Sequence, residues 1–305
     1  MIAQPRARPA AYHARMQAGA PLALVFGGSG QIGRALLPRL LDAGWQVRAV
    51  SRQPSAALPR LPGLTWQAGD LAHLPALPVE AQAIVSAGPL DLFAQWLPRV
   101  PAGVRVVAFG STSVHAKRAS PDPRERALAA RLQAAEHRLA ACAADEGRAI
   151  TLLRPTLIYG RGGDRSLSAI AALARRFGRV VLPTAAQGLR QPVHADDLAD
   201  AALAALARAL PGWHAFDLPG GEALPYREMV RRVLATLQPP PRLHALPLPL
   251  FLAALRTAQA LGIARALGPA AVRRMREDLV FDPQPARAAL GYAPRPFAPE
   301  PGQFG

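Results

Sequence analysis

Short apolar runs alternate with helix-like stretches through the first half of the chain. The run 22–26 ends at a cluster of glycines, and apolar residues then recur at helical spacing from Ile32 to Leu41, until Gly44. Continuous apolar runs predict buried strands, and a recurrence every three to four positions predicts helices. The alternation therefore predicts an α/β fold on a doubly wound parallel sheet, with ligands at the carboxyl ends of the strands. The expected strands cover 22–26, 46–50, 64–67, 83–86, 104–109 and 150–153, and a long helix covers about 124–144.

The pattern changes after Pro155, where prolines and glycines become denser. Residues 156–305 are predicted to form a smaller mixed α/β lobe that returns one strand and one helix to the core. Residues 1–20 contain arginine and proline but no apolar segment, so we expect a flexible basic extension and no signal peptide. Met1 and Met16 both stand as candidate starts. Helices are expected in the second half at about 196–210, 225–237, 249–267 and 269–278.

A glycine-rich turn joins the first predicted strand to the first predicted helix, which is the context that a G-x-x-G-x-x-G pattern requires. Its first glycine permits the tight turn, the second lets the backbone approach a pyrophosphate, and the third allows close packing of helix on strand. The start of the helix offers free N–H groups and a positive dipole end to phosphates. We therefore predict that residues 21–155 form a Rossmann-type NAD(P)-binding domain, with the cofactor on Gly27, Ser29, Gly30, Gln31, Ile32 and Gly33.

The end of the second strand indicates which dinucleotide is preferred. A protein that prefers NAD places Asp or Glu there to accept hydrogen bonds from the ribose hydroxyls. This chain has Ser51 and Arg52 with no acid nearby, and Arg52, helped by Arg34, suits a 2′-phosphate. We predict NADP, with NAD as the alternative if Arg52 is only a solvated surface arginine.

Several segments in order along the chain resemble the extended and atypical short-chain dehydrogenase/reductases, the superfamily of NAD(P)-dependent sugar-nucleotide epimerases and dehydratases. The resemblance runs from about Leu22 to Phe297. The segments that carry it are Phe26–Gly33, Asp70–Leu71, Ser86–Gly88, Gly110–His115, Leu153–Gly160, Val193–Leu198 and Asp282–Arg295.

The resemblance implies roles for individual residues. In that superfamily an acid at the place of Asp70, next to Leu71, meets the adenine amino group. Further residues at the places of Ala87, Gly88, Arg154 and Pro155 lie along the cofactor, the last two near the nicotinamide. Ser111 stands where the catalytic serine belongs. The implied substrates are sugar nucleotides or similar phosphorylated or acidic metabolites, bound by the second lobe. Family members often pair through helices of the nucleotide-binding half, which makes a homodimer the expectation.

The superfamily's Tyr-x-x-x-Lys pair is missing from this chain. In that pair the lysine lowers the pKa of the tyrosine, so that the phenolate exchanges a proton as hydride moves. The only lysine is Lys117, with Ser113 four residues before it. The expected helix reads Leu-Ala-Ala-Arg-Leu over 128–132, and none of Tyr12, Tyr159, Tyr226 and Tyr292 stands four residues before a lysine.

Other side chains are candidates for the missing chemistry. The Ser111 hydroxyl can hydrogen-bond a substrate oxygen, or it can bond to its own loop backbone. His115, four residues later, suits proton transfer near neutral pH, or it is a loop histidine in water. Asp164 and Arg165 lie in a loop expected to overhang the nicotinamide, where they position a polar substrate or serve as surface charges.

A metal site is not predicted. The segment with His194, Asp196 and Asp197 lacks an accompanying third ligand cluster, and it opens a helix in which Asp196 is a natural cap or first-turn acid. The single cysteine, Cys142, falls in an Ala-rich helical stretch and is expected to be a small packing residue.

Charge and hydropathy limit the partners. Lys+Arg 36 against Asp+Glu 20 gives a net charge of +16, but the charge is scattered and aromatics are only 6%, so nucleic acid is not the expected partner. A basic surface favours an acidic or phosphorylated ligand. The longest apolar run, 245–255, is too short to cross a membrane, which needs about 18 residues. We expect a cytoplasmic protein with no membrane partner.

Three functions remain open from the sequence. The first is an NAD(P)-dependent oxidoreductase or epimerase/dehydratase with Ser111 and a non-standard proton donor. The second, favoured by the missing tyrosine and lysine, is a cofactor-binding sensor or assembly protein without turnover. The third is a basic nucleic-acid binder with a vestigial dinucleotide fold, which steep salt dependence of binding would reveal.

Overall fold

The computed structural model describes residues 19–54, 58–72, 80–162, 164, 166–263 and 267–304. Most of the predicted basic extension, together with Tyr12 and Arg165, lies outside these residues. A seven-stranded sheet in the order β11-β6-β5-β4-β1-β2-β3 forms the centre, and every neighbouring pair in it is parallel. The doubly wound α/β fold predicted from the sequence is thereby confirmed. The strands are β1 (Leu22–Phe26), β2 (Gln46–Ser51), β3 (Leu64–Ala68), β4 (Ala81–Ser86), β5 (Arg105–Phe109), β6 (Ile150–Pro155) and β11 (Trp213–Leu218).

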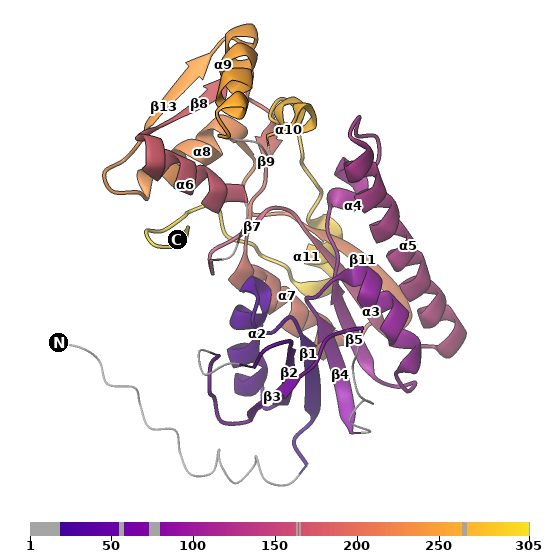
Figure 1. Cartoon of the computed structure of the whole chain (residues 1–305). Coiled ribbons are helices and arrows are strands. Elements are labelled where there is room, and N and C mark those ends of the chain that lie inside the picture. Colours follow the sequence, from indigo (N-terminus) through magenta and orange to yellow (C-terminus); the bar gives the residue numbers. More distant parts are fainter. Residues whose placement is uncertain are drawn as a thin grey trace, which may run out of the picture.

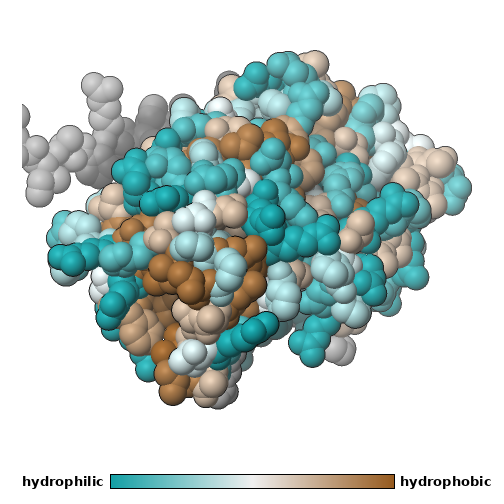
Figure 2. Space-filling view, turned by 90° about the horizontal axis from the view of Figure 1, so that it is seen from above, coloured by the Kyte–Doolittle hydropathy of each residue, from teal (hydrophilic) through white to brown (hydrophobic). Residues whose placement is uncertain are grey.

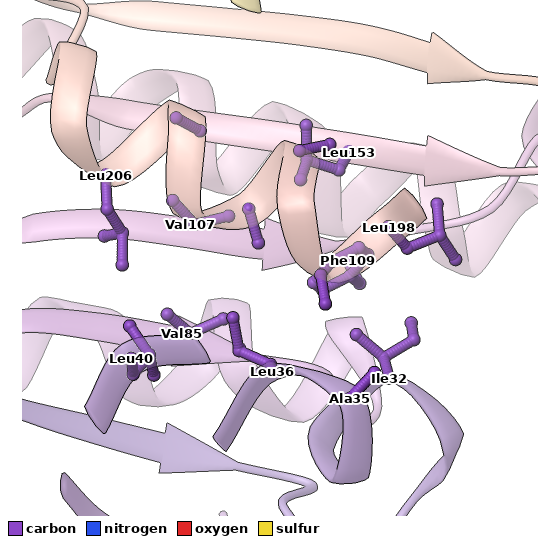
Figure 3. Packing of buried hydrophobic residues seen from close by; sticks show 14 of the residues in the cluster. Ile32, Ala35, Leu36, Leu40, Val85, Val107, Phe109, Leu153, Leu198 and Leu206 are labelled. Carbon is purple, nitrogen blue, oxygen red and sulfur yellow. The ribbon is translucent and has the colours of Figure 1, made fainter. Parts of the chain in front are cut away.

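Helices cover both faces of this sheet. On one face α2 (Gln31–Asp42) and α7 (Ala195–Arg208) pack side by side, and α11 (Gln284–Leu290) joins them. Figure 3 shows Leu36 and Leu40 of α2 and Leu198 and Leu206 of α7 directed into one core with strand residues. On the other face lie α3 (Leu90–Trp96), η1 (Leu97–Arg99) and α5 (Pro123–Glu146). Cys142 of α5 packs against this second core, as the sequence predicted.

The second half of the chain builds a smaller lobe. Figure 1 shows it above the end of the sheet from which α4 (Ser113–Ala116) and β7 (Ile158–Tyr159) leave. The lobe has its own core around Tyr159, Met229 and Phe297. Its elements are α6 (Ser166–Phe177), β8 (Arg179–Pro183), β9 (Leu189–Arg190), β10 (Val193–His194), β12 (Leu224–Pro225), α8 (Tyr226–Ala235), β13 (Arg242–Leu246), α9 (Leu248–Ala260) and α10 (Pro269–Arg274).

Two helices are shorter than the sequence predicted. The helix expected over 249–267 is α9, which ends at Ala260 because Gly262 turns the chain with a φ of 81°. The helix expected over 269–278 is α10, which ends at Arg274.

Figure 2 shows the lobe end of the molecule, where hydrophobic patches lie among hydrophilic side chains. Leu250 of α9 and Leu261, the C-cap residue of the same helix, are strongly exposed. Within the described ranges no helix combines the length and hydropathy that a membrane span needs.

Candidate functional site

The carboxyl edge of the sheet gathers the residues that the sequence singled out. Because all seven strands are parallel, the segments that leave them meet at one edge. The glycine turn leaves β1, Ala87 beside it lines the same cavity, and the other segments leave the remaining strands at the same edge. These segments are Ser51–Arg52 after β2, Asp70–Leu71 after β3, Ala87–Gly88 after β4, Ser111–His115 after β5 and Arg154–Pro155 at the end of β6.

The glycines of the turn meet two different demands. A Cβ on Gly27, which has a φ of 75°, would lie 2.7 Å from the carbonyl oxygen of Ala87, and one on Gly33 would lie 2.4 Å from that of Gly27. The fold itself therefore requires these two glycines. Gly30, the N-cap of α2, is exposed, and a Cβ there would approach only the Gly27 oxygen, at 3.3 Å. Packing therefore does not require a glycine at position 30. The missing side chain instead leaves room for a ligand.

A cavity of about 380 Å³ opens at this turn. Two arginines line it, Arg34 from α2 and Arg161 from the segment after β7, and among the described residues no carboxylate does. The amino end of α2, with no acidic residue in its first turn, also faces it. Gln31 Oε1 is buried there and has no partner within the described residues. Free N–H groups, a helix dipole and two guanidinium groups suit the pyrophosphate of a dinucleotide, so the residues present fit that cofactor. The lining residues are Gly27, Ser29, Gly30, Gln31, Ile32, Arg34, Ala87, Ile158, Arg161 and Gly162.

The residues predicted to contact the adenosine half lie at the ends of β2 and β3. Arg52 is exposed, and the Ser51 hydroxyl accepts a hydrogen bond from the Gln53 N–H at 3.4 Å. Asp70 Oδ1 accepts one from the Ala72 N–H at 2.9 Å, which shapes the loop after β3. Arg52 is thus open to solvent at the end of β2, and its predicted contact with a 2′-phosphate stays a prediction.

The loop after β5 is held by its own hydrogen bonds. Ser111 Oγ accepts from the Ser113 N–H at 3.1 Å, the loop-bonding role that the sequence left open. Its hydroxyl proton is still able to donate to a ligand. Thr112 Oγ1 and the Thr112 N–H both donate to the Pro155 carbonyl at 3.2 Å, which ties this loop to the end of β6.

His115 lies at one end of a chain of ionisable side chains at the ends of β6 and β11. Its Nε2 lies 3.4 Å from Asp217 Oδ1, and Arg154 Nη1 lies 3.5 Å from the same oxygen. Arg154 in turn donates from Nε and Nη2 to the two carboxylate oxygens of Glu136 at 3.0 and 2.6 Å. Neither Asp217 nor Glu136 was singled out from the sequence. Since Arg154 is occupied by these ion pairs, its predicted contact with the cofactor stays a prediction.

Apolar side chains stand at positions 128 and 132, where the sequence resemblance led us to expect a tyrosine and a lysine. Leu128, Leu132 and Glu136 stand four residues apart on α5 and so share one face of the helix. Glu136 accepts a hydrogen bond from Arg154 of β6, which places this face toward β6. Both leucines are half-buried, and Leu132 packs against the core. Lys117 Nζ lies 4.0 Å from Glu125 at the start of the same helix.

The three tyrosines within the described ranges are structural. Burial raises the pKa of Tyr159, and its hydroxyl donates to the Pro296 carbonyl at 3.3 Å. Burial also raises the pKa of Tyr226, whose ring lies under the guanidinium of Arg190, and that of Tyr292, whose hydroxyl donates to the Pro219 carbonyl at 2.7 Å. None of them has the lowered pKa that proton exchange by a tyrosine requires.

Of the two roles that the sequence left open for Asp196, cap or first-turn acid of α7, the structure shows the second. His194 is the N-cap, and its Nδ1 accepts from the Asp196 N–H at 3.1 Å. Asp196 sits in the first turn, where Arg161 and then Arg39 lower its pKa against the opposing effect of burial. Asp197 binds Arg295 at 2.7 Å. Within the described residues, no group of three or more His, Cys, Asp or Glu side chains is placed to hold a metal ion.

Asp164 is not the surface charge that the sequence left open as one of its two roles. It is buried, its Oδ1 accepts from the Leu167 N–H at 2.5 Å, and its Oδ2 accepts from the Ser168 hydroxyl at 2.8 Å. These bonds satisfy the start of α6.

Stability is expected to depend on pH through His194. Burial, and then the charge of Arg295, lower the pKa of His194 in the folded chain. The unfolded chain therefore binds this proton more readily, and the free energy of unfolding falls as pH drops below about 6.5. The His194→Asn variant keeps a capping acceptor without titrating, so its urea-unfolding free energy changes less between about pH 5 and about pH 7 than that of the wild type. Equal slopes for the two proteins would contradict this role.

Comparisons with known proteins place this geometry in a family. The model of the NAD dependent epimerase/dehydratase family matches residues 23–83 and 78–216. No curated protein matches the sequence. Among solved structures, a putative epimerase from Burkholderia cenocepacia J2315 is 20% identical with a TM-score of 0.64, covering 90% of this chain and 93% of that one. The NDP-hexosamine 5,6-dehydratase TunA is 16% identical with a TM-score of 0.67, covering 91% and 93%.

A third similar structure was solved with ligands. MoeE5 in complex with UDP-glucose and NAD is 20% identical with a TM-score of 0.61, covering 90% of this chain and 94% of that one. At these identities the structures show the fold, while the family match covers more than half of the chain and confirms the resemblance found in the sequence. The chain belongs to the NAD-dependent epimerase/dehydratase family.

Proposed function

We propose that the protein binds NADP at the glycine turn and uses it to oxidise, reduce, epimerise or dehydrate a sugar nucleotide or a similar acidic metabolite. The cavity at the turn carries this proposal, since it joins free backbone N–H groups to Arg34 and Arg161 with no described carboxylate in its lining. The substrate class is taken from the family and from neighbours such as MoeE5, whose structure holds UDP-glucose and NAD.

The substrate site in this proposal lies between the two lobes. The ring of His115 on α4 faces Phe281, from the segment after α10, with 6.1 Å between the ring centroids. An ion pair between Glu125 of α5 and Arg274 of α10 joins the lobes near the same place. In this proposal the Ser111 hydroxyl and the His115 imidazole lie next to the bound sugar.

His115 and Asp217 are proposed to do the work of the absent tyrosine and lysine. The bound nicotinamide supplies a hydride acceptor or donor, and a proton must move on the substrate oxygen as hydride moves. With Nε2 toward Asp217, the imidazole holds its proton on that side and presents Nδ1 as the base. Ser111 keeps its proton and donates a hydrogen bond to the same substrate oxygen.

The preference for NADP is expected to depend on Arg52. Replacing it by alanine removes the cation at the end of β2, so we expect NADPH affinity to fall by about tenfold or more while NADH affinity holds. Calorimetric titration of both nucleotides measures this, and Arg99→Ala, an exposed arginine on η1, is the control for loss of charge. Equal affinities of the wild type for NADPH and NADH would contradict the preference.

Turnover is tested with NADP and a set of UDP-sugars. UDP-glucose, UDP-galactose and UDP-glucuronic acid are incubated with the purified protein, nicotinamide absorbance reports net oxidation, and proton NMR of the sugar reports epimerisation or dehydration. A change in any of these sugars that requires NADP supports the proposed enzyme.

A second candidate function is a cofactor-binding sensor or assembly protein without turnover. The observation that favours it is the pair of half-buried leucines, Leu128 and Leu132, on the face of α5 where proton exchange is usual in the family. Tight NADPH binding with no change in any tested sugar would favour this second function.

A further inference from the structure

Arg161 lines the cavity from outside the glycine turn. It follows β7, and together with Ile158 and Gly162 it forms the wall that faces the amino end of α2. The turn and this wall are more than a hundred residues apart in sequence, and the fold alone brings them together.

The carboxylate of Asp196 holds the guanidinium of Arg161 in place. Asp196 accepts from Nε at 2.8 Å and from Nη2 at 3.0 Å, a two-bond contact that fixes the plane of the group. Arg39 Nη2 lies 3.6 Å from the same carboxylate and supports it from α2. Within the described residues the two N–H groups of Nη1 have no partner, so they remain to bind a ligand. The side chain is 42% exposed, which leaves it open to the cavity.

We propose that Arg161 is a diphosphate-binding residue that completes the cofactor site together with the glycine turn. In this arrangement Nη1 donates to a diphosphate oxygen whose other side meets the backbone N–H groups of the turn. The assignment rests on the proposed function, and it extends the site to a loop that the glycine motif does not include. A diphosphate occurs in both the dinucleotide and a sugar nucleotide, and the shared cavity with the turn assigns it to the dinucleotide.

The test compares probes with and without a diphosphate. NADPH, ADP-ribose and adenosine 2′-monophosphate are titrated by calorimetry into the wild type, Arg161→Gln, Arg161→Lys and Arg39→Gln. Arg161→Gln is expected to weaken NADPH and ADP-ribose by about tenfold to a hundredfold, the size of a charge-assisted hydrogen bond. It leaves adenosine 2′-monophosphate within about twofold, because that probe has no diphosphate. Arg161→Lys is expected to retain part of the affinity for NADPH, since lysine keeps the positive charge but lacks the planar set of N–H donors of arginine.

Arg39→Gln is the matched control. It removes the other arginine from Asp196 without touching the cavity wall, and it is expected to leave NADPH within about twofold of the wild type. An equal loss in Arg39→Gln, or unchanged NADPH affinity in Arg161→Gln, would overturn the role of Arg161 while leaving the proposed function in place.

UDP-glucose separates the two sources of diphosphate. If Arg161→Gln weakens UDP-glucose and not NADPH, the arginine serves the substrate and its assignment to the cofactor is wrong. If the wild type binds neither NADPH nor NADH, the proposed function fails, and the role of Arg161 fails with it.

Discussion

Replacing Gly30 by valine is expected to lower NADPH affinity by at least about a hundredfold while the chain stays folded. The first atom of the new side chain meets only the Gly27 carbonyl oxygen, at 3.3 Å, so a shift of a few tenths of an ångström accommodates it. The rest of the valine side chain occupies cavity space where a pyrophosphate must approach the backbone. Calorimetric titration measures the affinity, and thermal unfolding followed by circular dichroism measures the fold.

The chain offers a closely matched control at Gly268. Gly268 is the N-cap of α10 with φ −78° and ψ 171°, against −77° and 177° for Gly30 on α2, and a Cβ there would meet nothing within 4 Å. Gly268→Val therefore has a similar capping cost and is expected to leave NADPH binding unchanged. Gly33→Ala, by contrast, places a Cβ 2.4 Å from the Gly27 carbonyl oxygen and is expected to lower the unfolding temperature. Wild-type NADPH affinity in Gly30→Val would mean that the phosphates bind elsewhere.

Replacing His115 by alanine is expected to lower kcat by about a hundredfold to ten-thousandfold on any UDP-sugar that the wild type turns over. The imidazole is the proposed proton acceptor, and in the described part of the chain each tyrosine has a pKa raised by burial. NADPH affinity is expected to hold, because His115 is not among the residues that line the cavity at the turn. Added imidazole restores part of the activity of this variant, which loss of a merely structural side chain would not allow.

Asp217→Asn tests the partner of that histidine. The amide keeps the size of the side chain but removes the charge 3.4 Å from Nε2, so kcat falls while the KM for the sugar nucleotide holds. Asp200→Asn is the control, because Asp200 also pairs with an arginine, Arg39 at 2.5 Å, and lies on α7 away from His115. Full kcat in His115→Ala would refute the proton-transfer role of the pair.

The sheet and the glycine turn could be predicted because their signals are local. Leu22–Phe26 is almost wholly buried between two layers of helices, so it is a continuous apolar run, and the turn that follows it has fixed glycine spacing. β11 is different: its sequence, Trp-His-Ala-Phe-Asp-Leu, mixes polar and apolar residues, and only pairing with β6 makes it a strand of the sheet. Asp217 was missed for that reason, since it reaches Arg154 and His115 only through that pairing.

Arg161 and His194 show a second limit of the sequence. Arg161 stands in a Gly-rich stretch with no periodic pattern, and it reaches the glycine turn because β7 pairs with β10. His194 caps α7 although histidine is outside the set of residues preferred at an N-cap, so the sequence did not single it out as the cap. Contacts between distant segments decide the role of Arg161, while His194 makes a local contact, with the Asp196 N–H, that its residue type does not predict.

Calorimetric titration of the purified wild-type chain with NADPH and with NADH tests the nucleotide site most directly. We expect one NADPH to bind per chain and NADH to bind more weakly, in keeping with a pyrophosphate at the turn and a 2′-phosphate at Arg52. A chain that is folded by circular dichroism and binds neither nucleotide would contradict the assignment of the glycine turn as a dinucleotide site.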